Sequence, residues 1–223
     1  MSFLLAVTAG AAGPPQGASP PERERALFAH GNRIVVQVSP QGGIMTLTNG
    51  TWVNQRLPCR TFLRGIAYGN GLFVAVGGSY IHMRGVTMTS HDGTTWIRRN
   101  SKNTTTLYSV IYGHGLFVAV GDDGAIFTSP SGLDWRHQHS GTSMGLAAIA
   151  FGNGTFVAGG ESGTILASTN GVEWVRQCLG TSVYVGKIVF CDGRFLVRDS
   201  DATFSSTDGS LWLHRPANMV KTP

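Results

Sequence analysis

The sequence has little cysteine, little charge and no long apolar run, and each shortage excludes a class of protein. Its three cysteines lie far apart without a Cys-x-x-Cys pair, which excludes zinc-ribbon, c-haem and thioredoxin-like sites. Only 13% of the 223 residues are charged, and the basic ones occur singly or in pairs such as Arg98-Arg99. The net charge of +5 therefore does not indicate a nucleic-acid tract. The apolar segment 2–13 is too short to span a bilayer. We expect no nucleic-acid partner and no membrane span.

The cysteines and the two chain ends leave alternatives open. Cys59 and Cys178 fall in equivalent loops of the repeat and could form one disulfide, or they are, like Cys191, small semi-buried thiols. Segment 2–13 resembles the apolar core of a secretory signal, but no Lys or Arg precedes it. We predict an apolar and Pro/Gly-rich N-terminal arm over residues 1–25 and a C-terminal tail over 215–223.

Glycine is abundant, with 31 residues, and an internal repeat accounts for it. Five short apolar segments, each marked by one large side chain, recur 39 to 44 residues apart, and each is followed by a tryptophan on a polar turn. A period near 40 indicates a stacked or circular array of identical units. The apolar marks are Ile34, Phe73, Phe117, Phe156 and Phe195, and the tryptophans are Trp52, Trp96, Trp135, Trp174 and Trp212.

One unit contains four short strands. In the third unit we predict strands over 107–112, 116–120, 125–129 and 135–138, separated by turns rich in glycine. Four antiparallel strands in about 40 residues make one propeller blade, and a blade must stack on neighbours to bury its faces. The sequence therefore predicts an all-β, five-bladed propeller of four-stranded antiparallel blades, over residues 26–214, that closes when the last blade meets the first. The predicted blades are 26–58, 59–102, 103–141, 142–180 and 181–214.

The turn before each of the last four tryptophans repeats the pattern Ser-x-Asp-Gly-x-x-Trp. Asp, Asn or Ser at the third position can accept hydrogen bonds from N–H groups of its own turn, and glycine can adopt positive φ. The pattern resembles the Asp-box of sialidase-like (BNR) and photosystem-assembly-factor-like propellers. Its residues are Ser90, Asp92, Gly93 and Trp96; Ser129, Ser131, Gly132 and Trp135; Ser168, Asn170, Gly171 and Trp174; and Ser206, Asp208, Gly209 and Trp212.

The resemblance implies a structural role for these turns, with each tryptophan buried between blades. Asn170 and Ser131 are expected to be weaker substitutes for the turn-forming acid. The first unit has only Thr48-Asn49-Gly50-Thr51-Trp52, one residue short, so we expect its turn to be the least regular.

Candidate binding residues are those on the face that carries the turns between strands two and three and the loops between blades. This face would form a rim of mixed charge around a central funnel. The oversized loop 79–84 adds apolar and aromatic side chains, which either contact a partner or fold back over the funnel. The candidates are Tyr80, Ile81, Met83, Arg84, Arg98, Arg99, Asp122, Asp123, Arg136, Glu161 and Arg176.

Catalytic and metal-binding interpretations are weaker. The sialidase resemblance implies an arginine triad, a Tyr and Glu pair and an Asp acid/base, but the Phe-Arg-Ile-Pro motif is missing and Glu161 is the only Glu expected at the funnel. Asp122, Asp123 and Glu161 could bind calcium, although carboxylates in such turns are commonly turn formers. His137 and His139 have no third ligand nearby in the sequence. We predict no cofactor and no metal.

Three functions follow from these observations. The first is a non-enzymatic propeller that acts as a structural or protein-interaction subunit of a larger assembly, of surface, photosynthetic or phage-tail type, with protein partners at the N-terminal arm and the rim loops. The second is a lectin-like propeller that binds glycan at equivalent sites, and the third is a sialidase-like glycosidase.

Overall fold

The computed structural model describes residues 27–31, 34–39, 42–59, 61–79, 84–99, 105–198 and 202–216. The predicted N-terminal arm, residues 217–223 of the predicted tail, and the candidate residues Tyr80, Ile81 and Met83 lie outside this part of the chain.

The chain is all-β and forms five sheets of four antiparallel strands, each a simple up-and-down meander. Two single 3-10 turns, η1 (Asp122–Gly124) and η2 (Glu161–Gly163), interrupt the strand pattern. Sheet 1 contains β1 (Leu27–Gly31), β2 (Ile34–Val38), β3 (Ile44–Thr48) and β4 (Thr51–Asn54). Sheet 2 contains β5 (Thr61–Gly69), β6 (Leu72–Ser79), β7 (Gly85–Ser90) and β8 (Ile97–Arg99). Sheet 3 contains β9 (Leu107–Gly113), β10 (Leu116–Gly121), β11 (Ile126–Ser129) and β12 (Arg136–Gln138). Sheet 4 contains β13 (Leu146–Gly152), β14 (Thr155–Gly160), β15 (Ile165–Ser168) and β16 (Val175–Gln177). Sheet 5 contains β17 (Ile188–Cys191), β18 (Arg194–Arg198), β19 (Ala202–Ser206) and β20 (Leu213–Pro216).

Four apolar cores lie between successive sheets, because the second strand of each inner sheet is apolar on both faces. On β6, for example, Phe73 and Ala75 pack toward sheet 1, whereas Val74 and Val76 pack toward sheet 3. Side chains of a strand alternate between faces, so a strand buried on both sides has no polar alternation. The cores join sheets 1 and 2, 2 and 3, 3 and 4, and 4 and 5.

An aromatic ring on a glycine fixes each of these four interfaces. The first strand of a sheet carries an aromatic residue that packs over the last glycine of the preceding sheet's first strand. A Cβ on Gly69 would lie 2.0 Å from Cγ of Tyr112, a separation that no side chain can adopt. The four pairs are Gly31 with Tyr68, Gly69 with Tyr112, Gly113 with Phe151, and Gly152 with Phe190.

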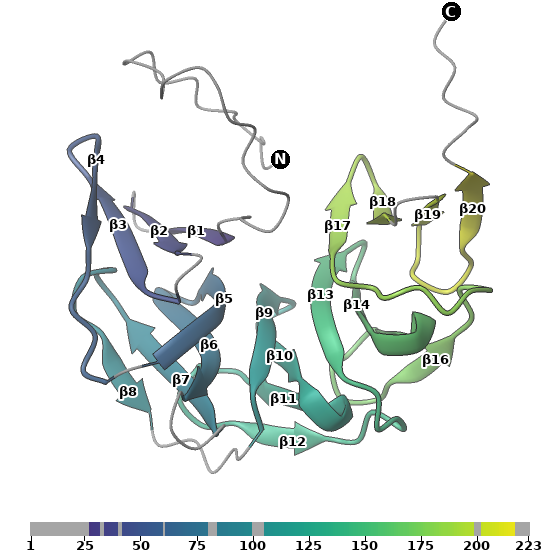
Figure 1. The fold of residues 1–223 in the computed structure, drawn as a ribbon, viewed down its shortest axis with the longest axis horizontal. Coiled ribbons are helices and arrows are strands. Elements are labelled where there is room, and N and C mark those ends of the chain that lie inside the picture. Colours follow the sequence, from purple (N-terminus) through teal and green to yellow (C-terminus); the bar gives the residue numbers. More distant parts are fainter. Residues whose placement is uncertain are drawn as a thin grey trace, which may run out of the picture.

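The five sheets form an arc that is open between sheet 1 and sheet 5. Figure 1 shows this arc with β5, β9, β13 and β17 on its inner side and β8, β12 and β16 on its outer side. Strands β1 and β5, β5 and β9, β9 and β13, and β13 and β17 are neighbours, but in the described part of the chain no extensive contact joins sheet 5 to sheet 1. The predicted closure of the ring is therefore not formed by these residues.

The strand register also corrects the first apolar mark. Val35 pairs with His30 as Phe73 pairs with Tyr68, so Val35, not Ile34, is the counterpart of the buried phenylalanines. Val35 is only half-buried, and among the described residues no sheet packs on this face of sheet 1. The sequence comparison was one residue out of register here.

The turns from Ser90, Ser129, Ser168 and Ser206 to the following tryptophan, the Ser-to-Trp turns, share one hydrogen-bond pattern. In sheet 2 the N–H groups of Thr94 and Thr95 donate to Asp92 Oδ1 at 2.8 and 2.7 Å, and Trp96 Nε1 donates to the Gly93 carbonyl at 3.1 Å. Gly93 adopts a φ of 69°, and a Cβ there would lie 2.8 Å from Val36 Cγ2 of sheet 1. The glycine is therefore required by its φ and by its contact with the preceding sheet.

Three expectations for these turns need correction. Asn170 accepts hydrogen bonds from two backbone N–H groups of its turn, at 2.9 and 2.9 Å, as many as Asp92 accepts. Ser131 accepts only one, at 3.2 Å. Trp96 is buried, but Trp135, Trp174 and Trp212 are half-buried at the sheet edge. The turn of sheet 1 is not irregular: Asn49 and Gly50, with φ of 50° and 77°, form a tight two-residue hairpin.

Candidate binding surface

The charged candidates lie in two kinds of element. Asp122, Asp123 and Glu161 lie in η1 and η2, on the turns between strands two and three. Four of the five candidate arginines, the outer set, lie on the fourth strands, at the outer side of the arc in Figure 1. These are Arg98 and Arg99 on β8, Arg136 on β12 and Arg176 on β16, while Arg84 is exposed just before β7.

Each of the two 3-10 turns is hydrogen-bonded to the loop that enters its own sheet. They are three-residue turns, not the expected two-residue hairpins, with Asp123 and Ser162 at φ of 55° and 51°. The backbone N–H of Asp122 donates to the Thr106 carbonyl at 3.1 Å. Glu161 forms two hydrogen bonds with Gly145. The Glu161 N–H donates to the Gly145 carbonyl at 2.9 Å, and Glu161 Oε2 accepts from the Gly145 N–H at 3.1 Å. The Glu161 carboxylate therefore holds the loop that enters sheet 4.

β-Bulges occur at the same position on three inner strands. The register of β5 skips Arg64, that of β9 skips Tyr108, and that of β13 skips Ala147. Each skipped residue lies four positions before the aromatic residue that packs on the glycine of the preceding sheet. The equivalent position before β17 of sheet 5 is Gly186. A bulge redirects a side chain and is typical of functional edges. The repeat therefore places a variable residue at this bulge in sheets 2, 3 and 4.

Arg64 and Tyr108 meet at this level and form a cluster with Phe62, Asp122 and Tyr184, the Arg64 cluster. The Arg64 guanidinium lies 5.4 Å from the Phe62 ring centroid and 5.1 Å from that of Tyr108. Burial and the interactions with Asp122 and Tyr184 raise the pKa of Tyr108 to about 12, although the positive charge of Arg64 acts to lower it. Tyr184 is 62% exposed, and a Cβ on Gly186 would lie 2.9 Å from its Cε1.

Of this cluster, sequence reasoning named Asp122 as a candidate binding residue but missed Arg64 and Phe62. The repeat alignment already made Arg64 and Tyr108 equivalent, because each lies four residues before a tyrosine, Tyr68 or Tyr112. Only the strand register reveals that this position is a bulge.

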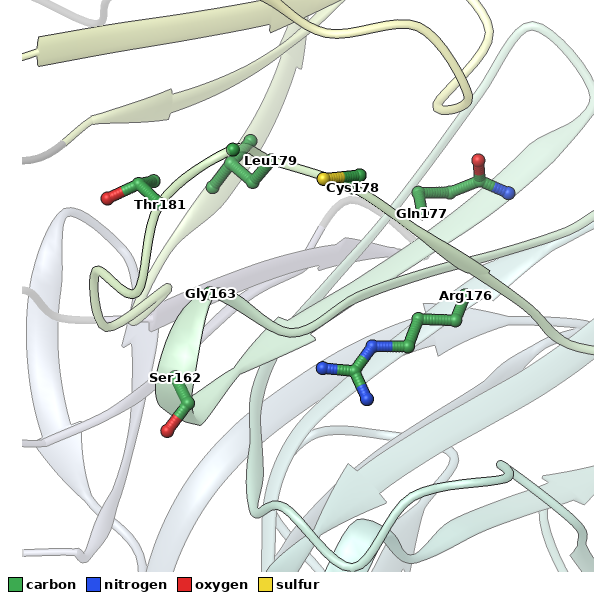
Figure 2. Close-up of a pocket in the computed structure, with 8 residues that line it drawn as sticks. Ser162, Gly163, Arg176, Gln177, Cys178, Leu179 and Thr181 are labelled. Atoms are coloured by element: carbon green, nitrogen blue, oxygen red, sulfur yellow. The ribbon is translucent and has the colours of Figure 1, made fainter.

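A hollow lies between η2 and the loop that leads to sheet 5. Its volume is about 400 Å³, and Figure 2 shows Ser162 and Arg176 on one side and the loop from Cys178 to Thr181 on the other. Leu179 is the buried residue of this loop and packs into the core between sheets 4 and 5. The hollow brings the outer Arg176 near η2, but it lies apart from the inner strands that carry the Arg64 cluster.

The cysteines are not paired. Cys59, Cys178 and Cys191 are all free thiols, so the possible bond between Cys59 and Cys178 is not formed. Cys59 precedes sheet 2 and Cys178 follows β16, at loops separated by three sheets.

The described residues contain neither a metal-ligand cluster nor a membrane-spanning helix. In this part of the chain no three His, Cys, Asp or Glu side chains gather in a way that could hold a metal ion. No helix within the described ranges is long and apolar enough to cross a membrane.

Comparison with known proteins gives a likeness of fold. No protein-family model and no curated protein sequence matches the chain. Among solved structures, YCF48 from Cyanidioschyzon merolae is similar with a TM-score of 0.60 and 14% identity, over 85% of this chain and 71% of that one. YCF48 bound to a D1 peptide has a TM-score of 0.58 and 14% identity, over 90% of this chain and 84% of that one.

Two further structures differ in function. A chain of the nidogen/laminin complex has a TM-score of 0.59 and 12% identity, over 81% of this chain and 74% of that one. The GH74 enzyme of Niastella koreensis has a TM-score of 0.59 and 16% identity, over 84% of this chain but only 30% of that one. All four are propeller-like, so the fold is shared with enzymes and with non-enzymatic proteins alike.

Proposed function

We propose that this chain is a non-enzymatic protein-binding module, a structural or interaction subunit of a larger assembly, which takes its partner on the inner side of the arc. The observation that carries the proposal is the set of bulges on β5, β9 and β13. They present Arg64, Tyr108 and Ala147 at one level, where a bulge costs ladder hydrogen bonds and is retained to aim side chains.

We further propose that the sheets are the five blades of an Asp-box propeller. The Ser-to-Trp turns support this, because an Asp or Asn oxygen accepts two backbone N–H groups in three of the four turns. The likeness to YCF48 bound to a D1 peptide, and to a chain of the nidogen/laminin complex, supports a partner that is a peptide or protein.

Neither alternative function has comparable support. A lectin with one sugar site per sheet needs equivalent residues in each sheet, but the bulge positions carry Arg64, Tyr108, Ala147 and Gly186, which share no chemistry. A glycosidase would need Glu161 free to act, whereas its carboxylate accepts the Gly145 N–H.

The test is binding of the purified chain to three probes: an array of random 12-residue peptides, a glycan array and a fluorogenic sialoside. We expect peptide binding that Tyr108→Ala weakens and that Arg136→Ala, an exposed change on the outer strand β12, leaves unchanged. Binding to several glycans without peptides, or sialoside hydrolysis abolished by Glu161→Gln, would contradict the proposal.

A further inference from the structure

We propose that Arg64 is the residue that recognises this partner, and that it does so by binding a carboxylate of an acidic peptide segment. This rests on the proposed function, and it adds the chemical class of the partner and the residue that selects it.

The first step is the way Arg64 is held. Phe62 and Arg64 come from β5, and Tyr108 comes from β9 of the next sheet, so the guanidinium lies over one ring of its own sheet and one ring of its neighbour. Both separations are within the range of a cation–π contact. The Arg64 side chain is exposed, so N–H groups among its five donors remain available for hydrogen bonds to a partner.

The second step is the rigidity of the platform. Tyr108 interacts with Asp122, which together with burial raises the pKa of Tyr108 to about 12 and keeps its ring a neutral phenol throughout the physiological pH range. The Asp122 N–H donates to the Thr106 carbonyl of the loop before β9 at 3.1 Å. Arg64 therefore lies over a ring that is backed by η1.

The third step is the partner that Arg64 lacks. Among the described residues its contacts are the Phe62 and Tyr108 rings, and no carboxylate forms an ion pair with it. A guanidinium fork matches a carboxylate with two parallel N–H···O bonds, which are stronger than bonds between neutral groups. The net charge of +5 also favours the approach of an acidic partner.

The fourth step is room for a chain beside that carboxylate. At the bulge positions after Tyr108 the residues are Ala147 and Gly186, which project little, and beyond them the Tyr184 ring is 62% exposed. A peptide anchored at Arg64 could pass Tyr108 and rest on the Tyr184 ring. Aromatic side chains of this kind add apolar contact area to an interface at low entropic cost.

The experiment compares four pools of fluorescent 12-residue peptides by anisotropy, using the whole chain. The pools carry either one glutamate or one glutamine among randomised neutral residues, each with a free or an amidated C-terminus. We expect the glutamate pools to bind about tenfold or more tightly than the amidated glutamine pool. Tight binding of the free-terminus glutamine pool would identify the terminal carboxylate as the source and would equally support the proposal.

Protein variants assign the effect to Arg64. Arg64→Met, which keeps an unbranched apolar chain against the two rings, should remove the preference for glutamate, and Arg64→Lys should retain part of it because lysine keeps the charge but not the fork. Arg98→Met, an exposed change on the outer strand β8, is the matched control and should leave binding unchanged.

Two results would overturn the inference, and they differ in what they leave standing. Equal binding of all four pools, or a glutamate preference that survives Arg64→Met, removes the role of Arg64 while the peptide-binding function stands. Absence of binding to every pool removes the proposed function as well. The comparison of glutamate with glutamine needs no protein variant, so it is decisive even if a variant fails to fold.

Discussion

The two faces of sheet 5 differ although the same strands build both. Toward sheet 4, β18 presents Phe195 and Val197, both fully buried. On the other face, which no sheet of the described part of the chain covers, the same strand presents Arg194, half-buried Leu196 and Arg198. In sheets 2 and 3 the positions of the two arginines are apolar. The side chains of β18 therefore alternate between buried and exposed positions, as expected of a strand that is covered on one face only.

The free face of sheet 1 is different again. Phe28 is 50% exposed and its ring centroid lies 5.9 Å from that of Trp52, so an aromatic pair covers this end of the arc. The free face of sheet 5 instead has a hollow of about 240 Å³ lined by Lys187, Arg198 and two apolar residues. An apolar end and a basic end do not complement each other, because an unpaired arginine is costly to desolvate against an apolar surface. The chemistry of the two free faces therefore does not favour their packing on each other.

The largest expected effect comes from the buried face of β18. Phe195→Ala should lower the free energy of unfolding by about 3–5 kcal/mol, because it leaves a cavity in the core between sheets 4 and 5. Leu196→Ala, the adjacent residue on the free face, should cost about 1 kcal/mol or less. Guanidinium chloride unfolding of both variants measures the difference. Equal losses would mean that the free face of sheet 5 is buried in solution.

The second largest expected loss of stability concerns the contacts between a glycine of one sheet and an aromatic ring of the next. Gly69→Ala places a Cβ where the Tyr112 ring lies and should cost about 1–3 kcal/mol through overpacking. Cys191 occupies the same position in sheet 5, where no following aromatic residue approaches, and Cys191→Ala should change stability by less than about 0.5 kcal/mol. Thermal unfolding of the two variants compares an inner interface with the free end. A large loss for Cys191→Ala would indicate that something packs on this face.

Much of the fold could be predicted from the sequence, because the repeat carries it locally. The four-strand unit, the turns and the five sheets follow from glycine positions and from apolar residues such as Phe73 and Phe117 that recur in register. Closure could not be predicted that way. Closure depends on whether the free faces of sheets 1 and 5 match. At these faces single residues depart from the repeat: Val35 stands where other sheets have a phenylalanine, and Cys191 stands where they have a glycine.

The site was less accessible to sequence reasoning. Arginines on the fourth strands were grouped with carboxylates of the turns because both follow polar loops, and of these arginines Arg176 lines a hollow with residues of η2. Arg64 was missed because it sits inside an apolar strand, where an arginine has no local signal. A bulge is defined by what the neighbouring strand pairs with, and β6 pairs with Leu63 and Gly65 but not with Arg64.

The smallest effect concerns the Ser-to-Trp turns and their pH dependence. In sheet 5 the backbone N–H of Ser210 bonds to Asp208 and, with further hydrogen bonds in the turn, lowers the pKa of that carboxyl to about 2; in sheet 2 bonds from Thr95 and Thr94 lower the pKa of Asp92. A depressed pKa stabilises the fold above the ordinary value near 4, and this contribution is lost as the pH falls from about 4 to 2. Asn170 accepts equivalent bonds without titrating.

Exchanging these residues isolates the contribution. Asp208→Asn should make the fall of the melting temperature between pH 4 and pH 2 shallower, and Asn170→Asp should make it steeper. Each change should stay below about 3 °C, because exposed carboxylates in water gain less than about 1 kcal/mol. Thermal melts across this pH range measure both slopes. If the two variants changed the slope in the same direction, hydrogen bonding within the turns would not be the source, and the pH dependence would have to come from charge elsewhere on the arc.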